Sequence, residues 1–404
     1  MKTFKLALKW IALMVLTAIV VGSLSAFFLI SLEFTTSTRE SSKFWVYLLP
    51  IGGFLAGLAY YRLGKGIEGD NNRVIAEMVK PNQKIHWKMS PMILFGTLAS
   101  HLFGASVGRE GTAVQMGAAS ADQWTSIFNL EKKERQVLLR MGVAAGFASI
   151  FGTPIAGFFF ALEMARDKIF SWYNLLVIAV TAYLGDLVCH LWEVHHTEYF
   201  ITEVPRLSFI SFGWTLLSAL CFGLTSLVFN ISKKKFGSYF TQFISYPPLR
   251  LAAAGALTLI FVLVFNTTDY LGLGVPIIQN AFTEQNEYYV FLVKLLLTAL
   301  ALGAGFKGGE ATPIFFMGAT LGSALFGFID LPLSLLAGLG FIAVFAGSTN
   351  TPLACIAMGG ELFGWEGFPY YIVVCFVAYF ISGQTSVYSE QVNQLRKYDW
   401  LRRK

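Results

Sequence analysis

Two glutamates stand where a carboxylate could compete with an anion for one binding site. Glu110 lies in the run Gly108-Arg-Glu-Gly-Thr, and Glu310 follows Gly308 and Gly309. Glycine permits the tight, exposed backbone with which a helix can begin inside a protein, and the N–H groups of a helix N-terminus attract anions. A carboxylate at such a start can fill the anion site while it is charged and leave it when protonated. We therefore take Glu110 and Glu310 as candidate gating and proton-coupling residues.

Both carboxylates also have ordinary structural explanations. An acidic residue in the first turn of any helix is stabilised by the helix dipole, and this is the alternative for Glu310. The same alternative fits Glu110 less well if it lies in a membrane, where an unpaired carboxylate costs several kcal/mol. Arg109 is expected to hold backbone or carboxylate groups rather than the anion, and His101 to be satisfied by local hydrogen bonds.

The composition indicates a polytopic membrane protein. Charged residues make up 13% of the 404 residues and hydrophobic ones 55%, whereas a soluble domain carries about 25% charged residues. Four charge-free stretches approach or exceed the roughly 20 residues that cross a bilayer as a helix. They are residues 11–32, 207–232, 311–329 and 367–389. A further apolar stretch, 331–360, contains Pro332 and Pro352 and predicts short or half-crossing helices.

The positive charges indicate membrane orientation rather than a nucleic-acid partner. The formal net charge is +6, but many of the Lys and Arg residues cluster at both ends of the chain and in two polar intervals, 61–90 and 233–235. We interpret these intervals as cytoplasmic loops, so both termini are expected in the cytoplasm, in a multi-pass protein of the cell membrane. The interval 61–90 has the length of a loop, and no separate soluble regulatory domain is expected.

Metal, redox and enzyme chemistry are not indicated. The four cysteines are each embedded in apolar sequence without a C-x-x-C pair. An intramembrane hydrolase, one alternative class, would need a metal-ligand or nucleophile constellation, and the sequence offers none. A structural or adhesion protein would leave the cost of intramembrane carboxylates unexplained. We expect no cofactor, no metal and no enzyme activity.

The second half of the chain repeats motifs of the first at a nearly constant offset. Glu110-Gly-Thr is matched by Glu310-Ala-Thr 200 residues later, and Met-Gly-Ala follows both. Thr153-Pro-Ile-Ala is matched by Thr351-Pro-Leu-Ala after 198 residues. Duplicated halves with broken helices are typical of transporters whose substrate site lies near the middle of the membrane, where helix N-termini point inward.

The repeat predicts the fold class and its division. We expect an all-α integral membrane protein built from two inverted repeats of tilted, partly broken transmembrane helices. The halves span about 5–195 and 207–390, within one transport domain, 1–404. Glu163 and Glu361 each follow the repeated Thr-Pro motif, ten residues after the threonine. Such matched residues at helix ends are more often structural, so both are secondary site candidates.

The run Gly108-Arg-Glu-Gly-Thr-Ala-Val-Gln resembles the G-R-E-G-x-x-V-Q signature of the CLC family of chloride channels and transporters. The glycine-rich run 303–313 resembles that family's second helix start, and Ser386-Val-Tyr-Ser resembles the beginning of its last helix, with a pore tyrosine at Tyr388. The resemblance spans nearly the whole chain. It implies a homodimer with one pathway per subunit, surrounded by membrane lipids.

Departures from the family's common pattern resemble its fluoride/proton antiporter branch. The G-S-G-I-P anion motif is replaced by Gly69-Asp-Asn-Asn-Arg, so that Asn71 stands where an anion-binding serine is expected. Glu310 and Thr312 occupy positions that are usually apolar in chloride members. Met164 stands where chloride/proton exchangers carry an inner glutamate, so the protons need another inner route.

The resemblance implies a protein that exports fluoride from the cytoplasm in exchange for inward proton flow. A chloride/proton antiporter and a passive anion channel of the same family are the alternatives, which halide uptake with a proton ionophore would separate. Neutral donors suit a small anion that must bind without being trapped. The implied anion-binding residues are Asn71, Thr312, Tyr388, Gly111 and Ala311, with Asn72, Glu163 and Glu361 as secondary candidates.

Overall fold

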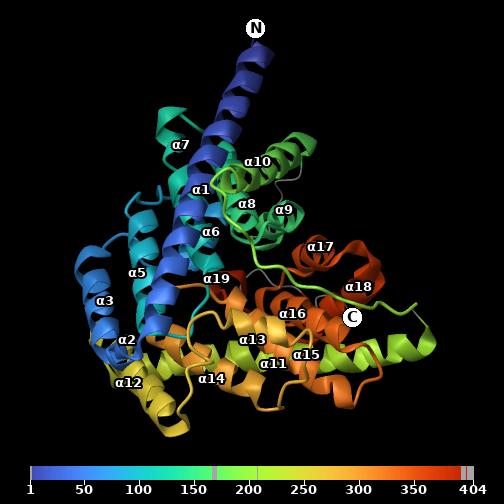
Figure 1. The fold of residues 1–404 in the computed structure, drawn as a ribbon. Helices are drawn as coiled ribbons and strands as arrows, with labels where there is room; N and C mark the ends of the chain where they lie inside the picture. The colour runs from blue at the N-terminus through green and yellow to red at the C-terminus, as the bar shows by residue number, and fades with distance from the viewer. Residues whose placement is uncertain (1, 166–170, 207, 393–396, 398–404) are drawn as a thin grey trace, which may run out of the picture.

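The computed structural model describes residues 2–165, 171–206, 208–392 and 397, most of which lie in helices (Figure 1). The helices of the first half are α1 (Lys2–Ser41), α2 (Phe44–Tyr47), α3 (Leu49–Leu63), α4 (Asp70–Val79), α5 (Met89–Phe103), α6 (Glu110–Ala121), α7 (Trp124–Ile127), α8 (Lys132–Phe151), α9 (Pro154–Glu163) and α10 (Trp172–His190). Those of the second half are α11 (Phe209–Phe243), α12 (Pro247–Phe265), α13 (Val275–Asn280), α14 (Val290–Ala304), α15 (Ala311–Ala324), η1 (Leu325–Gly327), α16 (Leu333–Thr349), α17 (Pro352–Phe363), η2 (Trp365–Gly367), α18 (Phe368–Ile381) and α19 (Ser389–Val392).

The second half repeats the packing of the first. α6 packs on α8 as α15 packs on α16, and α10 lies against α1 and α8 as α18 lies against α11 and α16. The two halves also touch directly, because α9 packs on α17 and α3 on α12. In the view of Figure 1 the long first helices of the halves, α1 and α11, cross at a steep angle. The predicted all-α membrane fold is confirmed.

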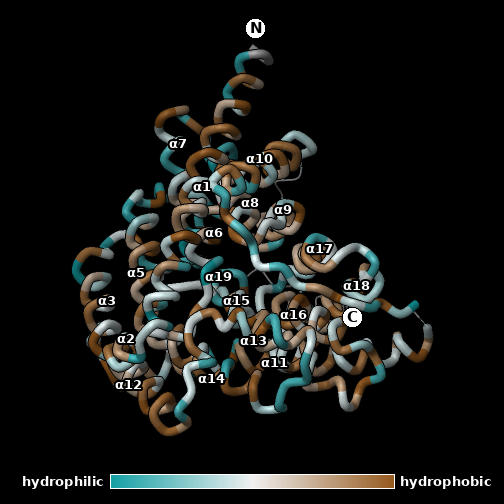
Figure 2. Tube along the Cα trace, in the orientation of Figure 1, coloured by the Kyte–Doolittle hydropathy of each residue, from teal (hydrophilic) through white to brown (hydrophobic). Residues whose placement is uncertain are grey.

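Four helices are long and apolar enough to cross a membrane, at residues 5–41, 172–190, 209–243 and 247–265. Two of the charge-free stretches lie largely within the first and third of these, whereas the stretches after residue 310 form the shorter apolar helices α15 and α18. The spans 172–190 and 247–265 contain Asp186 and Arg250, so a search for uncharged stretches misses them. Figure 2 shows hydrophobic residues along α3 and α12 and hydrophilic ones in the connection from α10 to α11.

The stretch 331–360 forms two short helices, as the sequence predicts. α16 ends at Thr349, and Asn350 adopts the left-handed conformation, with φ of 59°. Pro352 then starts α17, where the missing proline N–H is not needed by the first helical turn. The repeated Thr-Pro motif is therefore a helix start, and its equivalent Thr153 precedes α9.

Of the two intervals that the charge pattern predicts to be loops, one is wholly helical and the other contains a helix between two connecting segments. Lys233 to Lys235 lie inside α11, which continues to Phe243. The interval 61–90 contains α4. Lysine is a good helix former, so a cluster of lysines marks the end of the apolar part of a helix without ending the helix itself.

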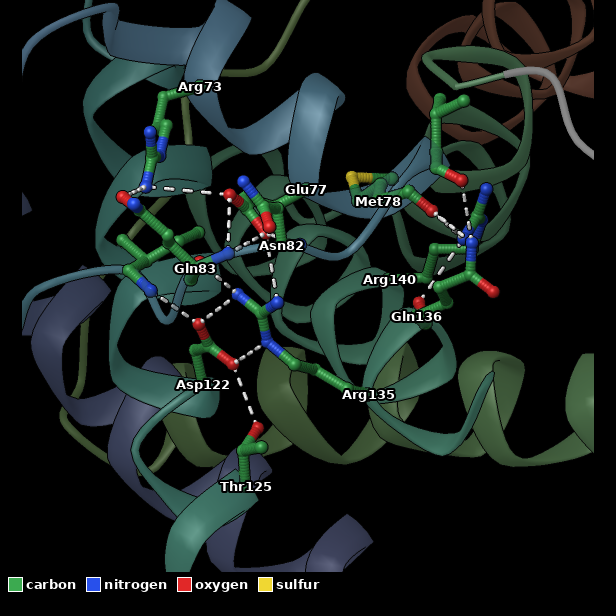
Figure 3. A network of polar contacts seen from close by, with 12 residues as sticks. Arg73, Glu77, Met78, Asn82, Gln83, Asp122, Thr125, Arg135, Gln136 and Arg140 are labelled. Carbon is green, nitrogen blue, oxygen red and sulfur yellow. Dashed lines mark hydrogen bonds and ion pairs between the residues drawn. The ribbon is translucent and has the colours of Figure 1, made fainter. Parts of the chain in front are cut away.

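A buried ion network fixes α4 against α8 and the segment that follows α4 (Figure 3). The Arg135 guanidinium donates from Nε to Asp122 Oδ1 at 2.7 Å and from Nη1 to Glu77 Oε2 at 2.9 Å. Glu77 also accepts the Asn82 N–H at 2.8 Å, and Asp122 accepts the Ile85 N–H at 2.7 Å. Because the carboxylates are paired and hydrogen-bonded, their burial is tolerated, and the C-terminal part of α4 is held in place.

Candidate functional site

The N-termini of α6 and α15 meet where the two repeats join. Gly108 N–H donates to the Gly309 carbonyl at 2.6 Å, and Gly309 N–H donates back to Gly108 at 2.8 Å. A methyl group on Gly309 would lie 2.5 Å from the Gly111 nitrogen and 2.7 Å from the Glu110 carboxyl carbon, so no larger residue fits. The glycines therefore let two helix starts approach backbone to backbone, as the motifs predict.

Glu110 reaches across this junction from α6 to the N-terminus of α15. Its Oε1 accepts the N–H of Ala311, and its Oε2 accepts the Thr312 N–H at 3.2 Å and the Thr312 hydroxyl at 3.1 Å. The Arg109 N–H donates to Oε2 at 3.1 Å. The side chain is only 3% exposed. A carboxylate thus occupies the place where the helix dipole and the unpaired N–H groups of α15 would hold an anion.

Asn71 lies beside the start of α6. It is 5% exposed, and a methyl group on Gly111 would lie 3.0 Å from its amide nitrogen. Its amide oxygen has no hydrogen-bond partner among the described residues. Asn71 belongs to the first turn of α4, after Gly69 with φ of 101°. The structure thus brings Asn71, Gly111 and Ala311 to the same junction as Glu110.

Glu310 pairs with a lysine of α11. The Lys233 ammonium lies 2.6 Å from Glu310 Oε1 and donates to the Val387 carbonyl at 3.0 Å. Glu310 is the N-cap residue of α15, but its side chain accepts no hydrogen bond from that helix. Glu310 is therefore held by an ion pair rather than by a capping hydrogen bond, at a position that the helix dipole also favours for a carboxylate. Lys233 is a partner that its place in a run of lysines conceals.

Tyr388 lies just before α19, and Asn72 of α4 contacts the start of that helix. Tyr388 is 4% exposed. Asn72 Oδ1 accepts the Glu390 N–H at 3.1 Å, which joins α4 to the start of α19. Asn72 therefore supports the last helix, while its neighbour Asn71 faces α6.

Glu163 and Glu361 lie at the ends of α9 and α17 and cap each other's helix. The Glu361 carboxylate accepts the N–H groups of Ile155 and Ala156, each at 2.8 Å. The Glu163 carboxylate accepts the N–H groups of Leu353 and Ala354 at 3.2 and 2.9 Å. Each glutamate thus neutralises the positive end of the other helix. This reciprocal pair explains their repetition and favours a structural role.

A cavity of about 360 Å³ reaches Arg109 on the side of α1 and the α10–α11 connection. Glu33, Thr36 and His195 also line it. The Arg109 guanidinium lies 6.0 Å from the centre of the Phe151 ring, and its Nε has no hydrogen-bond partner. His101 is fully buried, with Nε2 3.4 Å from the Gly108 carbonyl. Arg109 thus contacts the Glu110 carboxylate through its backbone N–H, and His101 contacts the backbone of the junction at Gly108.

The sequence motifs do not reveal three contacts around the junction. Lys233 pairs with Glu310, Lys307 donates to both carboxylate oxygens of Asp70 at 2.7 and 2.8 Å, and Thr97 shares a hydrogen bond of 2.6 Å with Thr112. Each joins residues from separate helices or connections. Within the described residues no group of three or more His, Cys, Asp or Glu residues is arranged to hold a metal ion.

Comparison with known proteins gives the same architecture. A curated relative from Pseudomonas syringae pv. tomato, described as a chloride/fluoride channel protein, is 44% identical over 95% of this chain and 86% of its own length. An H(+)/Cl(-) exchange transporter of Vibrio campbellii is 26% identical over 94% of this chain and 88% of its own. The crystal structure of a CLC-type fluoride/proton antiporter superposes with a TM-score of 0.92, at 32% identity, covering 96% of this chain and 98% of that one.

The family model described as voltage gated chloride channel matches residues 52–383. That range includes the start of α4, the junction of α6 with α15, and both reciprocal glutamates. The family match therefore covers most of a chain in which the two halves meet at the Glu110 carboxylate. The chain belongs to the voltage-gated chloride channel family, the CLC family, and is a multi-pass membrane protein.

Proposed function

We propose that this protein exports fluoride from the cytoplasm in exchange for protons that move inward. The observation that carries the proposal is the Glu110 carboxylate seated on the N–H groups of Ala311 and Thr312. A group that takes an anion's place and can be protonated links the movement of the anion to that of a proton. The relatives described as a chloride/fluoride channel protein and as a CLC-type fluoride/proton antiporter support the choice of fluoride.

Protonation of Glu110 determines whether its carboxylate or fluoride occupies the start of α15. Each hydrogen bond to a charged acceptor contributes about 1.5–3 kcal/mol, and a neutral acceptor gains roughly half as much. A proton on Glu110 therefore weakens several contacts at once, and fluoride can take over the N–H groups. When fluoride leaves, the deprotonated carboxylate returns. The charged carboxylate and fluoride thus exclude each other from the same donors, and protonation of Glu110 makes room for fluoride.

Neutral donors make the anion site. We assign fluoride binding to the Thr312 hydroxyl, the Asn71 amide, the Tyr388 hydroxyl and the backbone N–H groups at Gly111 and Ala311. These groups stabilise a small anion without the strong attraction of a bare cation, which would hold the ion in place. Glu310 serves as the second proton-coupling carboxylate, with Lys233 balancing its charge while fluoride is nearby.

The arrangement in the cell is part of the same proposal. The chain works as one transport domain of two inverted halves, about 5–195 and 207–390, and pairs with a second copy so that each subunit has its own pathway. Both termini face the cytoplasm, and the protein lies in the cell membrane. The exposed apolar side chains of α10 and α18, which include Leu187 and Phe380, provide a surface that lipid or a second copy can cover.

Fluoride-loaded liposomes test the proposal directly. We expect that an outward fluoride gradient drives proton uptake into vesicles that hold no other permeant ion, and that a proton ionophore collapses this uptake. Chloride at the same concentration should drive much less proton movement. A passive channel would instead show fluoride efflux whose charge is fully balanced by K⁺ crossing through a potassium ionophore, with no proton flux. Equal proton pumping by chloride would identify the chloride/proton alternative.

A further inference from the structure

A cavity of about 650 Å³ opens between the end of α3, the start of α12 and the end of α14. Its lining includes none of the residues assigned to the anion site, and its walls carry four basic side chains against one acidic one. The basic residues are Arg62, Lys65, Arg250 and Lys307, and the acidic one is Glu68. This charge balance attracts an anion, and the volume can hold one much larger than a halide.

Three of the four basic side chains have no carboxylate partner within the described residues. Arg250 donates to the carbonyls of Ile244 and Ser245 at 2.7 and 3.1 Å, which orients its guanidinium but leaves its charge unbalanced. Arg62 and Lys65 are exposed at the mouth of the cavity. Only Lys307 is neutralised, by Asp70.

The cavity opens onto the faces of two apolar helices. Leu55 of α3 and Leu249 of α12 are exposed beside it. Tyr61, on its rim, meets Tyr246 edge to face with ring centres 5.2 Å apart. Tyrosines concentrate where a membrane meets water, and Lys and Arg reach toward lipid phosphates at the same depth. A molecule in the cavity therefore has polar walls at one end and apolar helix faces at the other.

We propose that this cavity binds the phosphate of an anionic phospholipid headgroup, held by Arg62, Lys65 and Arg250. Basic pockets between membrane helices are the usual way in which a protein recognises such headgroups. The guanidinium of Arg offers a planar pair of donors to a phosphate, whereas Lys adds a point charge. The acyl chains then lie along the exposed apolar residues of α3 and α12. This binding does not depend on which ion is transported.

The bound lipid also steadies the segments around the anion site. Lys307 forms part of the cavity wall, and its ammonium lies 4.6 Å from the centre of the Tyr60 ring while it holds Asp70. Asp70 immediately precedes Asn71, and Lys307 precedes the start of α15 by four residues. A ligand that binds only the folded protein raises its melting temperature.

Lipid retention by native mass spectrometry tests the site. Purified protein is incubated with equal amounts of phosphatidylglycerol and phosphatidylcholine, and lipid-bound species are counted. We expect at least fivefold more phosphatidylglycerol than phosphatidylcholine on the wild type. The triple variant Arg62→Gln, Lys65→Gln, Arg250→Gln should lose this preference. Phosphatidylglycerol should raise the melting temperature of the wild type but not that of the variant. The matched control is Lys88→Gln, Lys132→Gln, Lys133→Gln, which removes three exposed charges outside the cavity and should behave like the wild type.

A soluble competitor separates the two sources of phosphate. Glycerophosphoglycerol carries the same phosphodiester without acyl chains, and at millimolar concentration it should displace little bound phosphatidylglycerol. Full displacement would overturn the lipid assignment and make the cavity a site for a soluble phosphate ester. Equal retention of phosphatidylglycerol by the triple variant, or of both lipids by the wild type, would overturn the site itself. None of these readouts requires transport activity.

Discussion

Glu110 makes four polar contacts that are all available to an anion, three from backbone N–H groups and one from a hydroxyl. Only proline would remove a backbone N–H, and it would also change the backbone, so the side chain itself is the part of this arrangement that can be tested cleanly. Glu110→Gln keeps the shape of the side chain but cannot lose or gain a proton near neutral pH. We expect this variant to lose fluoride-driven proton uptake in liposomes entirely. Undiminished proton pumping by the Gln variant would contradict the gating assignment.

The pair of Glu310 with Lys233 makes a second prediction. Lys233→Gln leaves a partly buried carboxylate near the anion path without its counter-charge, which costs on the order of 1 kcal/mol or more. We expect fluoride efflux to slow by roughly tenfold. The double variant Lys233→Gln, Glu310→Gln removes the unbalanced charge and should recover anion movement, though not proton coupling.

Lys234 provides the matched control for that experiment. It lies next to Lys233 on α11 but is exposed and makes no ion pair with a described residue. Lys234→Gln should leave fluoride efflux at the wild-type rate. If Lys233→Gln is also indistinguishable from the wild type, the ion pair does not affect transport.

Asn71 and Asn72 are adjacent but face different neighbours, which allows a test of selectivity. Asn71→Ser places at this position the residue expected in chloride members, and it should lower the preference for fluoride over chloride. Asn72→Ser loses a contact to the Glu390 N–H and should lower stability without changing that preference. The measurement is the ratio of fluoride to chloride efflux rates. An unchanged ratio in well-folded Asn71→Ser would place discrimination elsewhere, at Thr312 or Tyr388.

At the scale of helices, α9 and α17 are held together by exchange of their terminal glutamates. Glu361→Gln can satisfy only one of the two N–H groups at the start of α9 and loses the favourable charge at the helix dipole. We expect a loss of stability of about 1–3 kcal/mol, seen as a lower melting temperature, with the proton-to-fluoride ratio unchanged. Glu366→Gln, at an exposed position nearby, is the control. Lost coupling at an unchanged melting temperature would instead return Glu361 to the transport pathway.

The sequence predicts helix starts better than it predicts helix lengths. The helix starts at Gly108 to Thr112 and at Thr351-Pro352 can be predicted because glycine and proline have specific backbone requirements. By contrast, α11 runs through a cluster of lysines, and α10 and α12 each contain a charge that hides their apolar character. Charge placement reports where a helix meets water, not where the helix ends.

For the molecule as a whole, the repeat is what makes the site predictable. Equivalent positions 200 residues apart place Glu110 and Glu310 at equivalent helix starts, and the structure joins these starts at one junction. Pairings between residues that the repeat does not relate, such as Lys233 with Glu310 or Lys307 with Asp70, depend on how distant helices pack. No local pattern in the sequence encodes them, because each partner alone is an ordinary surface charge.

The bridge between Gly108 and Gly309 also makes the two halves unequal. Its two hydrogen bonds join positions 201 residues apart, whereas Glu110 and Glu310 are 200 residues apart, so the halves meet one residue out of the register of the repeat. Glu110 is the first residue of α6, but Glu310 lies just before the first residue of α15. The two glutamates therefore need not act alike: one reaches the helix start of the other half, and the other pairs with a lysine.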